Sequence, residues 1–101
     1  MRALALLAAV SVLLSTGCGE TRVSRGRAVF RSSCAGCHTV AGRERGAVGG
    51  DLVLAHLDVA DLASFARVMP ASKPLSRADA LAVADFVHGR AVSLATRGAS
   101  R

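Results

Sequence analysis

Two cysteines and a histidine lie close together in the sequence, at Cys34, Cys37 and His38. This C-x-x-C-H spacing is the pattern at which a haem is attached covalently to a protein. Two thiols three residues apart can reach the vinyl groups of neighbouring pyrrole rings and form two thioether bonds. The imidazole that follows directly can then lie under the iron, where its neutral nitrogen binds the metal. The motif therefore predicts one haem c, attached through both cysteines, with His38 as an axial ligand.

Three other kinds of site could use the same residues. A thioredoxin-like redox pair has its C-x-x-C within a βαβ unit, and the sequence shows no such pattern. A structural zinc site has four ligands in two spaced pairs, and the chain has no second C-x-x-C. A plain disulfide would suit an exported protein, but it does not need the adjacent histidine. These alternatives stay open beside haem attachment, which uses all three residues.

Three stretches of the chain carry apolar residues at helical spacing, and none shows the alternation typical of a half-exposed strand. We expect helices over residues 24–33, 59–68 and 76–89. Their predicted N-caps are Ser24, Asp58 and Ser76. Pro70 stops the second helix, and Gly89 is placed to end the third. The C-x-x-C-H motif thus follows the first helix directly, and a glycine-rich loop leads from it to the second.

The start of the chain has the layout of a segment that is removed on export. A positive start is followed by an uncharged apolar run over residues 3–14 and by small residues at 15–17. The run is too short to span a bilayer, which favours a secretory signal. Cys18 follows a small residue, as in the lipobox that it resembles, where the cysteine becomes an acylated N-terminus. Acylation would hold the domain on a membrane surface, whereas an ordinary signal would leave Cys18 as a free thiol.

Charge and composition restrict the kinds of partner. The formal net charge is +6, and the basic residues are scattered along the sequence. Because the chain has no Trp or Tyr, it lacks the stacking aromatics typical of single-stranded nucleic-acid binding. The positive charge instead favours docking on acidic protein surfaces. The domain is also small, with three Phe, and a covalent macrocycle would add the apolar body that its core lacks.

Together, these features make the chain similar to a class I cytochrome c of the short bacterial type. Gly26 and Phe30 precede Cys34 as in the first helix of that family, which crosses the C-terminal helix at close range. The resemblance implies an all-α cytochrome c fold, with three main helices and glycine-rich loops wrapped around one covalent haem. The expected organisation is a signal peptide over 1–17, a tether over 18–23, a cytochrome c domain over 24–90 and a frayed polar tail over 91–101.

The resemblance also assigns residues around the iron. Gly49 to Leu52 matches the family's Gly-Pro-x-Leu, in which the proline carbonyl holds the histidine ligand. Here Gly50 replaces the proline, so its carbonyl is expected at His38 with a less rigid backbone. Leu52 is expected to pack on the haem.

The second axial ligand is predicted from the pair Met69-Pro70, which matches the family's Met-Pro ligand pair. A thioether opposite a histidine favours reduced iron and raises the reduction potential. Alternatively, Met69 fills the core at a helix end, as many methionines do. His56 and His88 are rival ligands. If neither binds the iron, His56 is a surface or packing residue, and His88 is a residue suited to a helix C-terminus.

Two axial positions filled by protein leave no iron site for a substrate. The resemblance therefore implies a one-electron carrier on the periplasmic side of a bacterial membrane, not an enzyme. Its partners would be other redox proteins that dock at an exposed haem edge, with no nucleic acid and no small-molecule substrate. Candidates for a charged rim around that edge are Arg43, Arg45, Arg67 and Lys73. The alternatives are a fixed haem c subunit of a larger respiratory or dehydrogenase complex, and an enzyme of the peroxidase or thiol oxidoreductase type.

Overall fold

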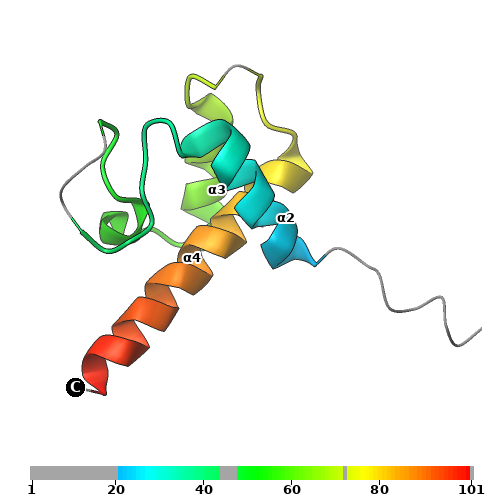
Figure 1. Cartoon of the computed structure of the whole chain (residues 1–101). Helices are drawn as coiled ribbons and strands as arrows, with labels where there is room; N and C mark the ends of the chain where they lie inside the picture. Colours follow the sequence, from blue (N-terminus) through cyan, green and yellow to red (C-terminus); the bar gives the residue numbers. More distant parts are fainter. Residues whose placement is uncertain (1–20, 44–47, 72, 101) are drawn as a thin grey trace, which may run out of the picture.

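The computed structural model describes residues 21–43, 48–71 and 73–100, and within them the fold is all-α. The α-helices are α2 over Arg22–Val29, α3 over Val59–Val68 and α4 over Arg77–Ala99 (Figure 1). A π-helical turn over Phe30–Cys34 extends α2, and a 3-10 turn over Leu52–Ala55 precedes α3. Outside the helices, the described residues form one isolated bridge, between Thr39 and Asp51, and no strand. The predicted fold class is confirmed.

Local capping signals set two of the helix starts as predicted. Asp58 accepts a hydrogen bond from the Asp61 backbone N–H at 2.8 Å and caps α3, which ends before Pro70. Ser76 caps α4 through the Asp79 N–H at 3.1 Å. Each carboxylate or hydroxyl satisfies a donor that the first helical turn leaves without a backbone acceptor.

The predicted cap of the first helix is wrong. Thr21, and not Ser24, caps α2, because its side chain accepts the Ser24 N–H at 3.1 Å. The earlier start adds residues whose side chains reach α4. Arg22 lies 3.1 Å from an Asp85 oxygen.

The predicted end of the third helix is also wrong. Helix α4 continues through Gly89 to Ala99, so residues 91–99 are helical and do not form a frayed tail. A glycine inside a helix costs only about 1 kcal/mol relative to alanine, and packing beyond it offsets this cost. The Arg90 Nε donates to the Val40 carbonyl at 3.3 Å. The side chain of Leu94 is partly buried near Gly42.

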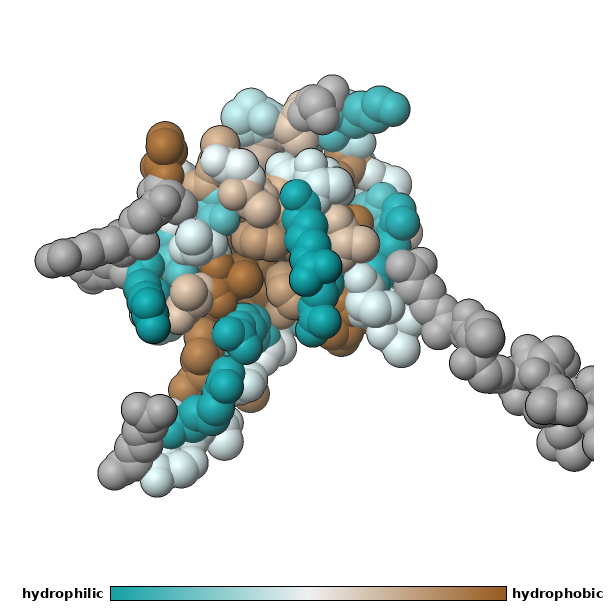
Figure 2. Space-filling model, viewed as in Figure 1, coloured by the Kyte–Doolittle hydropathy of each residue, from teal (hydrophilic) through white to brown (hydrophobic). Residues whose placement is uncertain are grey.

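The core lies where α2 and α3 pack against α4 (Figure 1). Gly26 is buried at the crossing of α2 with α4, and a Cβ there would overlap the Ala82 carbonyl. At this crossing the rings of Phe30 and Phe86 lie 5.8 Å apart, with an interplanar angle of 49°. On the face seen in Figure 2, apolar residues gather near the middle, and hydrophilic residues lie across and around them.

Two glycines inside helices, Gly26 in α2 and Gly89 in α4, allow a matched test of this crossing. Gly26→Ala is expected to destabilise the protein by about 1–3 kcal/mol, because the added methyl group forces the two helices apart. Gly89→Ala is expected to stabilise it by about 0.5–1 kcal/mol, because nothing lies within 4 Å of its added Cβ. Denaturant unfolding of both variants measures the difference, and equal effects would contradict the close crossing.

Candidate cofactor site

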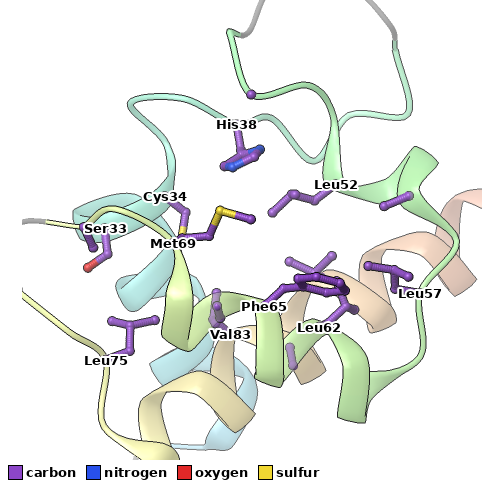
Figure 3. Close-up of a pocket in the computed structure, with 16 residues that line it drawn as sticks. Ser33, Cys34, His38, Leu52, Leu57, Leu62, Phe65, Met69, Leu75 and Val83 are labelled. Carbon is purple, nitrogen blue, oxygen red and sulfur yellow. The ribbon is translucent and has the colours of Figure 1, made fainter.

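An apolar cavity of about 320 Å³ lies between the C-x-x-C-H segment, the 3-10 turn, α3 and α4 (Figure 3). The volume is at the lower end of the range of about 300–1,000 Å³ that ligand pockets occupy. The polar side chains that line the cavity are those of Ser33 and His38. The remaining lining residues are apolar, apart from one glycine and Cys34. A cavity of this kind suits a large apolar cofactor with a single histidine ligand on one wall.

His38 supplies an imidazole to the lining of the cavity. The turn after the π-helical segment places it, because its backbone N–H donates to the Cys34 carbonyl at 2.9 Å. Its imidazole Nδ1 lies 3.2 Å from the carbonyl oxygen of Gly50. When Nδ1 carries the proton and donates to this carbonyl, the Nε2 lone pair is available for a metal. The Gly50 carbonyl therefore lies beside the imidazole of His38, within hydrogen-bond distance of Nδ1.

Gly49 packs directly against the same imidazole. A Cβ at this position would lie 2.6 Å from His38 Cε1 and 2.8 Å from the Cys37 carbonyl oxygen. Any side chain would therefore push the ring or the backbone away. Gly50, the next residue, has a φ of 80°, a conformation that glycine adopts readily. The glycine pair thus lets the loop approach the imidazole closely and turn away from it.

The two cysteines of the motif are not joined to each other by a disulfide. Cys34 is partly buried and lines the cavity, whereas Cys37 is exposed. Burial raises the pKa of the Cys34 thiol above its ordinary value. Thiol oxidoreductases need the opposite shift, because the thiolate is their nucleophile. The all-α fold and this pKa both disfavour the thioredoxin-like alternative.

Met69 reaches the cavity from the chain that follows α3. Pro70 restricts the preceding residue to the extended region, and Met69 has φ −65° and ψ 146°. The helix ends there, and the Met69 side chain turns into the space below His38 (Figure 3). It is 46% exposed. Its thioether and the His38 imidazole thus line one cavity from two separate segments.

The other residues predicted for the site differ in whether they line the cavity. Leu52 lines the cavity (Figure 3). His56 and His88 do not line it; both border a separate hollow between the 3-10 turn and α4. Among the rim candidates, the exposed side chains are those of Arg43, Arg67 and Lys73. Cys18 and Arg45 lie outside the described residues, as does the predicted signal segment.

Asp51, for which no role was predicted, is a buried carboxylate beside this site. It is 8% exposed and caps the 3-10 turn by accepting the Val53 N–H at 2.9 Å. Burial by itself raises the pKa of this carboxyl, but the hydrogen bonds that it accepts, from Thr39 first, lower the pKa below its ordinary value. An aspartate directly before a short apolar segment is an N-cap signal that could have identified it.

The residues present fit a haem c. The cavity is apolar, one thiol of the C-x-x-C pair borders it, and an imidazole and a thioether line it from different segments. The model of a family described as "Cytochrome C oxidase, cbb3-type, subunit III" matches residues 21–87, about two thirds of the chain. The chain belongs to this family of c-type cytochrome domains.

Membership of this cytochrome c family establishes the cofactor and the general chemistry. The domain binds haem c covalently, with its iron, and belongs to the electron-transfer proteins. No curated protein and no solved structure shows significant similarity to the chain. Among the helices that the structure describes, none has both the length and the apolar character to cross a membrane.

Proposed function

We propose that the protein is a monohaem one-electron carrier in an electron transport chain on the periplasmic side of a bacterial membrane. The observation that supports this most is that His38 and Met69 line the same apolar cavity. In the proposal Cys34 and Cys37 form the thioethers, His38 and Met69 are the axial ligands, and Leu52 packs on the ring. The bound haem supplies reversible one-electron chemistry, and the chain supplies the ligands and the apolar surroundings.

A carrier is favoured over an enzyme by the same two ligands. Iron held by an imidazole and a thioether has no open position where peroxide or oxygen could bind. The thioether also stabilises reduced iron, which suits a carrier of relatively high potential. Phe65, 49% exposed, and Met69 lie where the cavity meets the surface. This opening is the proposed edge at which redox partners dock, with Arg67 and Lys73 as candidate rim charges.

We further propose that Cys18 is acylated after removal of the signal over residues 1–17. Helix α2 begins at Arg22, so few residues would separate the acylated cysteine from the folded domain. Residues 22 and 23, predicted as part of the tether, belong to α2. Even with the remaining residues up to Thr21 fully extended, the domain would stay within about 20 Å of the membrane. A short tether keeps the carrier near membrane-bound redox enzymes.

A second candidate function is a fixed haem c subunit of a larger respiratory or dehydrogenase complex. The description of the matching family as an oxidase subunit favours it. The two functions differ in how the protein behaves on gentle extraction from membranes. Copurification with stoichiometric partner chains supports the subunit, and a freely exchanging monomer supports the carrier.

Intact-protein mass spectrometry of the exported chain tests the cofactor and the anchor together. The host must be competent to attach haem to c-type cytochromes. We expect the mass of one haem to persist after denaturation, and the mass of acyl chains to map to Cys18. A colourless polypeptide would contradict the proposed function. Haem without acyl mass would remove the lipid anchor and leave the carrier function in place.

A further inference from the structure

Asp51 is a buried carboxylate whose partners are all hydrogen-bond donors. In the part of the chain that the structure describes, no Lys or Arg side chain forms a salt bridge with it. A buried charge without such partners is costly unless hydrogen bonds satisfy it. Its Oδ2 atom accepts from the Thr39 hydroxyl at 2.8 Å. The same oxygen accepts from the backbone N–H groups of Ala41, Gly42 and Arg43 at 2.8, 3.0 and 3.4 Å.

The two carboxylate oxygens connect two different segments. Oδ2 accepts hydrogen bonds from the segment that follows His38, residues 39–43. Oδ1 accepts the Val53 N–H at the start of the 3-10 turn. The backbone supports the same connection, because the Leu52 N–H donates to the Thr39 carbonyl at 2.9 Å. Asp51 therefore fixes the register between the histidine segment and the loop that returns beside it.

Gly50 directly precedes Asp51, so the position of its carbonyl depends on this register. Its carbonyl is 3.2 Å from His38 Nδ1 and also accepts the Thr39 N–H at 3.4 Å. The residue is a glycine at a φ of 80°, so neither a ring nor a side chain restrains its backbone. Its neighbours must therefore fix the direction of its carbonyl, and Asp51 directly follows it.

We propose that Asp51 is a positioning residue for His38: its carboxylate fastens residues 39–43 to the 3-10 turn and so holds the Gly50 carbonyl at His38 Nδ1. The inference rests on the proposed function, in which His38 binds the iron. A fixed carbonyl keeps the proton on Nδ1 and makes the imidazole a stronger donor to the metal. A stronger donor favours ferric iron and lowers the reduction potential.

Asp51→Asn in the holoprotein tests the proposal. The amide keeps one oxygen and gains an NH2 group, so either the Val53 N–H or the donors of residues 39–43 lose their acceptor, and the connection between the two segments is broken. The His38 Nδ1 proton, followed by NMR, is expected to exchange about tenfold faster, the ratio that one net hydrogen bond supports. The reduction potential is expected to become more positive. Asp58→Asn is the matched control, because it removes the same charge from an exposed N-cap that asparagine fills equally well. It should change neither quantity.

Thr39→Val distinguishes the positioning of His38 by Asp51 from the effect of the Asp51 charge. It removes one hydrogen-bond donor to Oδ2 and leaves the carboxylate in place. Faster Nδ1 exchange in this variant, by a smaller factor than in Asp51→Asn, supports the proposal. If Asp51→Asn yields no holoprotein, Thr39→Val decides alone. Unchanged exchange would then overturn the positioning role. A shifted potential with unchanged exchange in Asp51→Asn would also overturn it, since Asp51 would then act through its charge alone.

The failure of the proposed function is distinguishable from these outcomes. A wild-type protein without haem, or a low-spin spectrum that survives His38→Ala, contradicts the assignment of His38 before any Asp51 variant is compared. Either result would overturn the positioning proposal together with the function on which it rests.

Discussion

Replacing His38 by alanine is expected to abolish the low-spin haem spectrum of the exported protein, although both cysteines remain. The imidazole is the single nitrogen ligand that lines the cavity in the described part of the chain. Without it the iron has at most a thioether from protein, which is too weak a ligand to keep the low-spin state by itself. Absorption spectra of the oxidised and reduced protein measure the loss, and intact mass shows how much haem remains attached.

The other two histidines provide matched controls for this experiment. His88→Ala removes a partly buried imidazole from α4, and His56→Asn removes an exposed one. Asparagine is the better replacement at residue 56, because His56 has a φ of 53°, which asparagine tolerates. Both control variants should keep the low-spin spectrum. A spectrum retained in His38→Ala and lost in either control would move the proximal ligand away from the C-x-x-C-H motif.

The sequence predicted those parts of the fold that depend on nearby residues. Helix α3 starts after Asp58 and ends before Pro70, because a cap and a proline act within one turn. The crossing of α2 with α4 was predictable from Gly26 and Phe30 only through family resemblance. The motif itself predicted a haem, and the family match establishes haem c.

Tertiary packing decided what the sequence could not predict. Gly89 is a residue type that often ends a helix, and it stands where the predicted helix should end. Helix α4 nevertheless continues, because Arg90 and Leu94 pack against the loop that follows His38. Thr21 and Ser24 are both good caps, and the ion pair of Arg22 with Asp85 in α4 accompanies the earlier start. Asp51 was missed because its donors come from residues 39–43, a loop whose return to the 3-10 turn no local pattern indicates.

Replacing Met69 by leucine is expected to remove the near-infrared charge-transfer band that is typical of methionine-bound ferric haem. Leucine has nearly the volume of methionine, so it keeps the apolar wall of the cavity and removes only the sulfur. The reduction potential should fall, because the thioether that stabilised reduced iron is gone. The reduced protein should also bind carbon monoxide readily, since the sixth position is open. Near-infrared absorption, redox titration and carbon monoxide difference spectra measure the three effects.

The leucine variant distinguishes a ligand from a core residue, and an alanine variant would not. Met69→Ala removes the sulfur and also opens the cavity wall, so a lost band could reflect a disturbed site. If Met69 only fills space, Met69→Leu should keep the band, the potential and the resistance to carbon monoxide. The neighbouring Val68, 76% exposed and absent from the cavity lining, provides the control Val68→Ala. A band that survives in Met69→Leu and disappears in His56→Asn or His88→Ala would assign the sixth position to that histidine. The end of the 3-10 turn, where His56 lies, or helix α4, which contains His88, would then have to move toward the haem, because neither imidazole borders the cavity in the structure.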